Sequence, residues 1–246
     1  MRKIKIFITL LLATLFGCMM FSACELNLGK TQQKEEPLTA EQIVGTYVFE
    51  GYYKLVDDEV KKQIEGDAIE ALKASRFQAN VDSTASLTSM GETISGTWKI
   101  SHNQILFEST IEGKSGSIIF AYANSSLFSL KGEEYISFKK ETSSSSENSV
   151  PIENIVGTYQ YVTTIDVNDG KFVEIQEQNA GAITLNADGT GFIKDYNSEE
   201  GETITWKLSN NNLLIIKTTE SISSFISYSN STIAVIYGSE AIIFKK

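Results

Sequence analysis

The chain has 246 residues, with 31 Asp and Glu against 21 Lys and Arg, a formal net charge of −10. An acidic chain of this kind repels nucleic acid and anionic lipid headgroups, so we expect neither as a partner. One histidine and two cysteines leave little material for a catalytic triad or for a metal site with nitrogen or sulfur ligands.

The first 23 residues have the layout of a secretory signal. Arg2, Lys3 and Lys5 form a cationic start, and an almost uncharged apolar run follows over 6–21. The run closes with Phe-Ser-Ala directly before Cys24. This tetrapeptide resembles the lipobox of bacterial lipoproteins, in which the cysteine is acylated and becomes the first residue of the mature protein. The resemblance implies an exported lipoprotein that a lipid anchor holds in the bacterial cell envelope, in a membrane that the sequence leaves open.

Two alternatives to lipidation at Cys24 remain. Cys18 fits the pattern less well, because bulky Phe16 stands where a small residue is usual. A plain signal peptide, or an uncleaved anchor with incidental cysteines, is the other alternative, although the apolar run is shorter than the roughly 20 residues of a membrane span. Without residues 1–23 the charge is about −13 and Cys24 is the only cysteine, which excludes a disulfide framework.

Two polar stretches separate the remaining chain into parts. Residues 24–42 are rich in Gln, Glu and Lys and predict a tether, while 141–151 contain a run of four serines and predict an interdomain linker. Between and after them, one pattern occurs twice. Ile-Val-Gly-Thr-Tyr at 43–47 returns at 155–159, Thr-Trp-Lys at 97–99 returns at 205–207, and Phe-Lys-Lys closes both copies. The sequence therefore predicts two duplicated domains, 43–140 and 152–246.

Each copy has the pattern of short antiparallel strands. In the second copy, segments 182–185 and 191–194 flank an Asp-Gly turn, and 206–208 and 213–216 flank an Asn-rich turn. Strands at 223–227, 232–237 and 241–245 complete a meander. Seven or eight strands per copy predict an all-β protein made of two tandem small antiparallel up-and-down barrels, each closed or nearly closed.

Residues 57–76 break this pattern in the first copy. Apolar side chains recur four residues apart at Val60, Ile64, Ala68 and Leu72, which predicts a helical insert that Gly66 and Asp67 could divide, with Asp67 as the cap of the second part. The insert would plug one barrel end or form a lid over a ligand cavity. The second copy lacks this pattern, and 167–181 predict a strand and a turn.

The Gly-Thr-Tyr openings, the Trp strands and the meander together resemble the lipocalin-like domains of bacterial lipoproteins. The resemblance implies a barrel of the calycin type. Both copies have Tyr where lipocalins have Trp in the Gly-x-Trp motif, and both are shorter than a full lipocalin. Neither has a late arginine to stack on the opening aromatic ring. The likeness therefore concerns the fold and brings no ligand with it.

No residue pattern indicates catalysis or a cofactor. His102 is the only histidine, and Asn210 holds its place in the second copy, so we interpret it as a turn residue. The segment 186–191 resembles a calcium loop but lacks the glutamate at its twelfth position, which favours a hairpin. Trp98 and Trp206 recur at matching positions, which favours the core over a ligand-stacking surface.

Tyr52 and Tyr53 are the candidate ligand-binding residues. Strand alternation places them on opposite faces, so one of them should face the barrel interior near the predicted helix. We therefore expect a noncatalytic protein that binds a small apolar or amphiphilic ligand. The alternative is a structural or interaction module with solid barrels that binds another envelope protein, and an enzyme of unknown class is the third possibility. A ligand cavity of roughly 300 Å³ or more would favour the first, and a filled interior the second.

Overall fold

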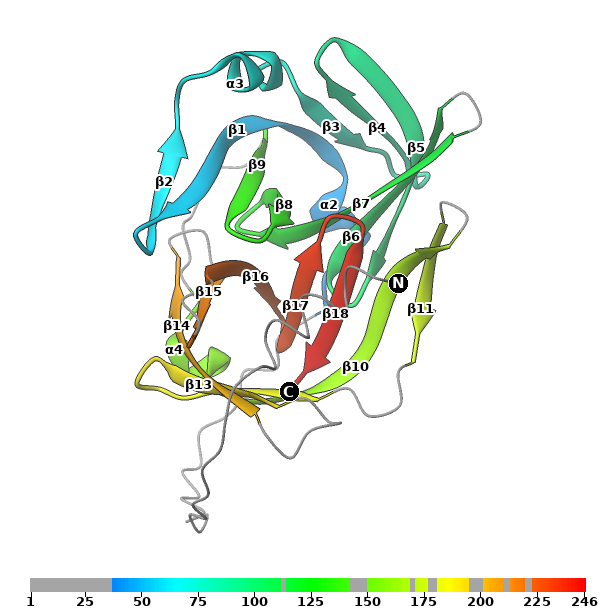
Figure 1. Ribbon diagram of the computed structural model, residues 1–246. Helices are drawn as coiled ribbons and strands as arrows, with labels where there is room; N and C mark the ends of the chain where they lie inside the picture. The colour runs from blue at the N-terminus through cyan, green and yellow to red at the C-terminus, as the bar shows by residue number, and fades with distance from the viewer. Residues whose placement is uncertain are drawn as a thin grey trace.

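The structure of the chain is a computed structural model that describes residues 37–111, 114–141, 150–168, 171–176, 181–194, 201–209, 213–219 and 223–246. Cys24, the signal at 1–23 and most of the linker at 141–151 lie outside the described residues. The described part is almost entirely antiparallel β-sheet with short helices (Figure 1), which confirms the all-β prediction.

The first nine strands form a closed ring of eight strands, ring 1, with one further strand beside it. Strand β1 pairs with β3 near its start and with β9 along most of its length, and neighbouring strands pair in order from β3 to β9. Strand β2 pairs with the second half of β1. The strands are β1 Gly45–Val56, β2 Glu59–Gln63, β3 Arg76–Ala79, β4 Thr84–Ser89, β5 Glu92–Ser101, β6 Gln104–Ile111, β7 Lys114–Ala123, β8 Ser126–Lys131 and β9 Glu134–Lys140.

The last nine strands repeat this arrangement as ring 2. Strand β10 pairs with β12 and β18, the strands from β12 to β18 pair in order, and β11 lies beside β10 as β2 lies beside β1. Both opening strands contain a register shift at the same place. The strands are β10 Gly157–Asn168, β11 Lys171–Ile175, β12 Ala182–Leu185, β13 Thr190–Lys194, β14 Gly201–Leu208, β15 Leu213–Thr218, β16 Ser223–Ser229, β17 Thr232–Tyr237 and β18 Glu240–Lys245.

Each ring is filled by its own side chains. The ring 1 interior contains Tyr47, Phe77, Phe107 and Phe120, all at most 1% exposed, together with Trp98. The ring of Phe77 lies 5.1 Å from that of Phe120 and 5.5 Å from that of Phe107, measured between centroids. Ring 2 contains a corresponding cluster around Tyr159, Trp206, Leu214 and Ile233. These interiors are therefore packed cores.

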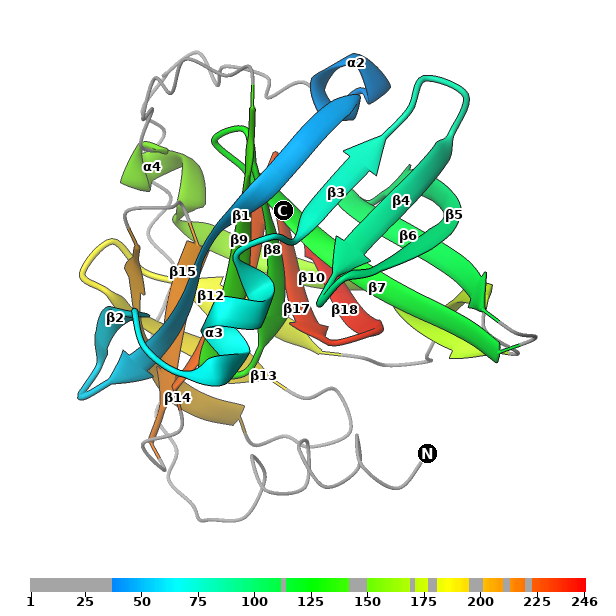
Figure 2. The ribbon, with the colours of Figure 1, turned by 90° about the horizontal axis from the view of Figure 1, so that it is seen from above.

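A four-residue helix precedes each opening strand. Helix α2 (Ala40–Ile43) precedes β1, and α4 (Ile152–Ile155) precedes β10; the last residue of each helix is fully buried against the interior of its ring. Figure 2 shows α2 at one end of β1 and the β1–β2 hairpin at the other. The first three residues of helix α2 fall within the range 24–42 predicted as a tether, and Leu38 also packs against the ring 1 interior. The folded part thus begins several residues before Ile43.

The helix predicted over 57–76 is wrong in its first half. Asp57 and Asp58 form a tight turn with positive φ angles of 54° and 61°, and β2 follows as a strand. Only α3 (Asp67–Leu72) is helical, and Gly66 rather than Asp67 is its N-cap. Pairing with β1 overrides the four-residue spacing of Val60 and Ile64. The second copy has the counterpart of β2 in β11, and its described residues contain no counterpart of α3.

The two rings pack against each other through an apolar layer. The layer combines outward-facing side chains of β6 to β9 with those of β15 to β18, among them Leu106, Ile119, Tyr135, Ile215, Phe225 and Ala241, each at most 4% exposed. The rings of Tyr135 and Phe225 meet edge to face at 4.7 Å between centroids. The structure therefore has three apolar clusters, one inside each ring and one between the rings.

Candidate functional site

The repeated Gly-Thr-Tyr motif forms the closed floor of each ring. The hydroxyl of Tyr47 donates to the carbonyl of Ile43 at 2.8 Å, and the hydroxyl of Tyr159 donates to that of Ile155. The Lys140 ammonium lies 5.8 Å from the centroid of the Tyr47 ring and donates to the Gln42 carbonyl at 2.9 Å. The chain lacks the late arginine that stacks on the opening aromatic ring in lipocalins. Lys140 lies over the ring of Tyr47 in its place.

The glycine of the motif makes room for this lysine. Gly45 and Gly157 have φ angles of 143° and 144°, a region that other residues rarely adopt. A Cβ at Gly45 would lie 2.7 Å from Cε of Lys140, and one at Gly157 would lie 2.6 Å from Cε of Lys246. The Gly-Thr-Tyr and Phe-Lys-Lys motifs therefore meet at one end of each ring and have a structural role there.

We expect Gly45→Ala to lower the free energy of unfolding by about 1–3 kcal/mol, because alanine is strained at this φ and displaces the lysine stem. Urea unfolding followed by circular dichroism measures the effect. Gly116→Ala is the matched control, since Gly116 has no positive φ. Equal stability of Gly45→Ala and the parent chain would contradict this role for the glycine.

Trp98 and Trp206 belong to the ring interiors, as predicted. They are 5% and 7% exposed. Their indole N–H groups donate at 3.0 Å to the carbonyls of Asn80 and Asn186 respectively. Each indole thus packs in the core and secures the turn at its end of the ring, so neither presents a ring face to a ligand.

Tyr52 and Tyr53 point to opposite faces of β1, as predicted, but the described pocket is lined by neither. Tyr53 stacks on Tyr135 at 4.7 Å between centroids and packs against the layer between the rings. Tyr52 pairs with Ile136, which packs against the ring 1 interior. Burial, a hydrogen bond to Glu134 and the charge of that carboxylate raise the pKa of Tyr52 to about 12. Its hydroxyl is therefore a neutral donor to Glu134 at neutral pH.

The same contact gives a pH-dependent prediction. Hydrogen bonds from Tyr52 and Lys54 lower the pKa of Glu134. The ionised carboxylate therefore stabilises the fold when the pH is above its pKa in the unfolded chain. This contribution is lost as the pH falls through the lower pKa of the folded state. We expect Glu134→Gln to cost about 0.2–1 kcal/mol at pH 7, because the pair is partly exposed, and less at pH 3. Urea unfolding at both pH values tests this. Glu92→Gln is the exposed control, and an equal cost at both pH values would contradict the assignment.

His102 lies at a hairpin tip, as predicted. Its φ of 49° and that of Asn103, 59°, are typical of a tight turn between β5 and β6. The turn contacts ring 2, where Glu174 accepts a hydrogen bond from Ser101 at 2.7 Å and lies 3.4 Å from Nε2 of His102. The histidine therefore contributes to the contact between the rings.

The segment with the weak likeness to a calcium loop is also a hairpin turn. Asp188 Oδ1 accepts hydrogen bonds from the backbone N–H of Thr190 at 2.9 Å and from its hydroxyl at 2.6 Å. Asp82 and Thr84 form the same turn in ring 1. Both carboxylates thus stabilise turns, and these hydrogen bonds lower the pKa of each.

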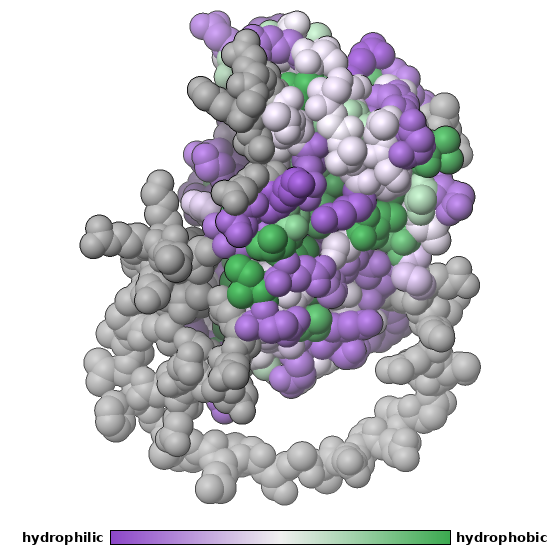
Figure 3. Space-filling model, turned by 90° about the vertical axis from the view of Figure 1, so that its right-hand side faces the viewer, coloured by the Kyte–Doolittle hydropathy of each residue, from purple (hydrophilic) through white to green (hydrophobic). Residues whose placement is uncertain are grey.

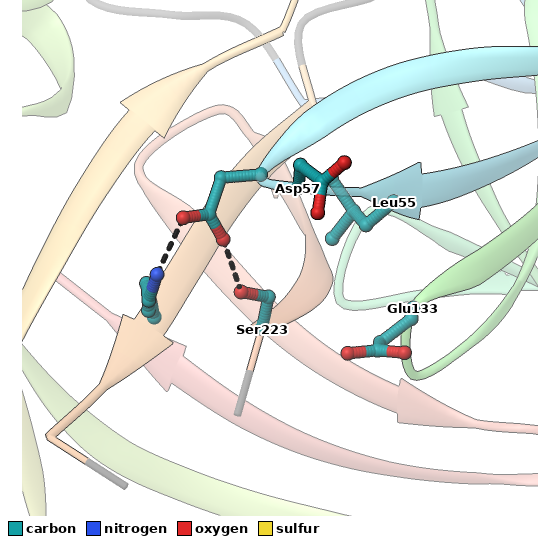
Figure 4. Close-up of a pocket in the computed structure, with 6 residues that line it drawn as sticks. Leu55, Asp57, Glu133 and Ser223 are labelled. Atoms are coloured by element: carbon teal, nitrogen blue, oxygen red, sulfur yellow. Dashed lines mark hydrogen bonds and ion pairs between the residues drawn. The ribbon is translucent and has the colours of Figure 1, made fainter. Parts of the chain in front are cut away.

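A pocket of about 430 Å³ lies where the β1–β2 turn meets ring 2 (Figure 4). Leu55, Asp57, Asp58 and Glu133 line it from ring 1, and Lys217 and Ser223 line it from ring 2. Asp58 Oδ2 pairs with the Lys217 ammonium, and Asp58 Oδ1 accepts a hydrogen bond from the Ser223 hydroxyl at 3.0 Å. The pocket is thus polar and lies outside both ring interiors. No local sequence pattern indicates this pocket, because its residues come from different copies.

The chemistry of this pocket suits a contact better than a reaction. The hydrogen bond from Lys217 lowers the pKa of Asp58, with help from Ser223, so Asp58 is a weak base at neutral pH. Ser223 donates to a carboxylate that is already paired, and none of the described lining residues is a histidine that could activate the serine as a nucleophile. Asp58 therefore joins the β1–β2 turn to ring 2.

On the face in Figure 3, hydrophobic residues occur in small groups among hydrophilic ones. Within the described ranges, no three His, Cys, Asp or Glu side chains are grouped as metal ligands. Among the helices that the structure describes, none combines the length and the apolarity that crossing a membrane requires.

Comparison with known proteins adds no family assignment. No family model and no curated protein matches this sequence.

Proposed function

We propose that the chain is a noncatalytic, lipid-anchored structural or interaction module of the bacterial cell envelope, built from two solid lipocalin-like domains at 43–140 and 152–246. The observation that carries this proposal is the filled interior of each ring. Aromatic and aliphatic side chains that are almost fully buried occupy the space in which a lipocalin would hold its ligand. A protein of this kind acts through its outer surface and its turns.

Carriage of an apolar or amphiphilic ligand, which we expected first from the sequence, has less support. The described pocket exceeds the roughly 300 Å³ that a small ligand needs, but five of its six lining residues are polar or charged. An apolar chain has little surface to contact there. Tyr52 and Tyr53, the candidate binding residues, have protein partners in Glu134 and Tyr135.

Native mass spectrometry of residues 25–246, incubated with fatty acids and phospholipids, tests the proposal. We expect the bare protein mass throughout. The variant Phe77→Ala, probed with benzene, provides a control with an artificial cavity and shows that the assay detects an apolar guest. A stoichiometric lipid that leaves the parent chain only on denaturation would overturn the proposal in favour of a carrier.

The anchor has a separate test. In bacterial cells fed an alkyne fatty acid, we expect Cys24→Ser to abolish labelling of the protein and to leave an unprocessed precursor. Cys18→Ser is the matched control and should be labelled as strongly as the parent. Labelling that is lost with Cys18→Ser and kept with Cys24→Ser would contradict the assignment of the modified cysteine.

A further inference from the structure

The layer between the rings uses the same positions of each copy. The pairings align Leu106 with Ile215, because Trp98 faces Phe107 in ring 1 and Trp206 faces Ile216 in ring 2. The shared C-terminal motif aligns Ile119 with Phe225 and Tyr135 with Ala241. All six of these aligned side chains lie in the layer. Each ring therefore offers the same patch to the other.

The backbone contacts across the layer are reciprocal. The N–H of Phe225 donates to the carbonyl of Gly132 at 2.9 Å, and the N–H of Ile119 donates to that of Gly238 at 3.4 Å. Ile119 corresponds to Phe225, and Gly132 corresponds to Gly238, at an offset of 106 in each case. The two hydrogen bonds are therefore images of one another under exchange of the rings, as in a two-fold dimer.

One pair of residues marks the axis of this exchange. Lys131 of β8 pairs with Tyr237 of β17 in antiparallel register, and these two residues also correspond at the same offset. A residue that meets its own counterpart lies next to a two-fold axis. The apolar layer and the reciprocal hydrogen bonds thus have a common axis.

The β1–β2 and β10–β11 hairpins are also held by equivalent positions of the opposite ring, although the residues at these positions differ in chemistry. Glu108 faces Thr97 in ring 1, and Lys217 faces Thr205 in ring 2, so these residues correspond. Glu108 accepts a hydrogen bond from the N–H of Phe172 in the β10–β11 hairpin at 2.9 Å. Lys217 binds Asp58 in the β1–β2 hairpin. Each ring therefore holds the hairpin of the other at the same position, but through a contact specific to that hairpin, because a pair of two ring 1 copies would set Glu108 against Asp58.

We infer that this surface is a self-complementary dimer interface, and that it also accepts the same ring of a second copy of this chain. The interaction does not depend on the covalent link at 141–151. The link only raises the local concentration of one ring near the other. The inference concerns assembly and does not depend on the proposed function.

Cleavage of the folded chain tests the inference. A protease site replaces 143–148 in the chain 25–246, and the cut protein is examined by native mass spectrometry at about micromolar concentration. We expect the two halves to remain a one-to-one complex. Halves that separate while each keeps the circular dichroism spectrum of a β-sheet would overturn the inference.

A single cysteine then tests self-complementarity. In the cleaved variant Lys131→Cys, exchange between molecules brings two ring 1 halves together with both introduced thiols at the axis, so we expect a disulfide-linked ring 1 dimer. Lys73→Cys, at the exposed C-cap of α3, is the matched control and should give none. A complex of the two halves that persists while Lys131→Cys gives no disulfide-linked ring 1 dimer would overturn the self-complementary surface.

The uncut chain provides a measurement that does not depend on the stability of the halves. The double variant Lys131→Cys/Tyr237→Cys should form an intrachain disulfide, because residues opposed in an antiparallel pair lie about 4.5–5.5 Å apart at Cα, within the range of a disulfide. Absence of this bond under oxidising conditions would contradict the arrangement of the rings.

Discussion

Phe77→Ala is expected to lower the free energy of unfolding by about 3–5 kcal/mol, the range for removing a fully buried phenylalanine side chain. Phe77 is 0% exposed, and its ring contacts those of Tyr47, Phe107 and Phe120. Because three large rings surround the site, the interior cannot collapse fully into the space that the substitution leaves. Urea unfolding of the chain 25–246 measures the loss.

Phe192→Ala is the matched control for this prediction. Phe192 lies on β13 and is 39% exposed, so the same truncation there should cost much less. A loss below about 1 kcal/mol for Phe77→Ala would contradict a filled interior, since truncation beside an existing ligand cavity leaves less packing to lose.

Phe225→Ala is expected to be about as costly, at about 3–5 kcal/mol, and to weaken the coupling between the rings. Phe225 is 1% exposed, packs on Tyr135 across the layer and donates its N–H to Gly132. Its neighbour Ile226 points into ring 2, so Ile226→Ala is a control on the same strand and the opposite face. We expect both variants to lose stability, but only Phe225→Ala to lose contacts with ring 1.

The two tryptophans provide a separate signal for each ring. Trp206→Phe leaves Trp98 as the reporter of ring 1, and Trp98→Phe leaves Trp206 as the reporter of ring 2. We expect both reporters to give one unfolding midpoint in the otherwise unchanged chain, and to give separate midpoints once Phe225→Ala is added. Coincident midpoints with Phe225→Ala, or separate midpoints without it, would contradict a coupling layer between the rings.

The strands of this fold were largely predictable from the sequence. Repeated Gly-Thr-Tyr, Trp and Phe-Lys-Lys motifs located corresponding elements, and turn residues such as Asp188 and Gly189 located the hairpin between β12 and β13. The strand β2 was missed because apolar residues four apart also occur by chance in a short charged strand. Its pairing with β1, which decides its structure, is not visible in local spacing.

A signal for the layer between the rings was present in the sequence. The run Leu213–Ile216 is apolar at every position, and the described structure buries its alternate side chains in ring 2 and in the layer. A strand with one face in water would alternate instead. Continuous runs of this kind indicate that both faces of a strand are covered, although they do not identify what covers the outer one.

The candidate site was less predictable. Tyr52 and Tyr53 were placed on opposite faces correctly, but their partners Glu134 and Tyr135 come from β9, far along the chain. The stacking of Lys140 on Tyr47 could have been found from the repeated Phe-Lys-Lys motif, since a lysine can replace the missing arginine. The pocket at Asp58 depends on how the rings pack, which no local pattern contains.

Xenon binding tests the central claim, that the rings are solid, most directly. Xenon under pressure enters dry apolar cavities and is located in crystals of the chain 25–246. The account predicts no xenon inside either ring of the parent protein, and one site beside Phe107 and Phe120 in Phe77→Ala. Well-occupied xenon sites inside the rings of the parent protein would contradict the account and restore ligand carriage as the leading function.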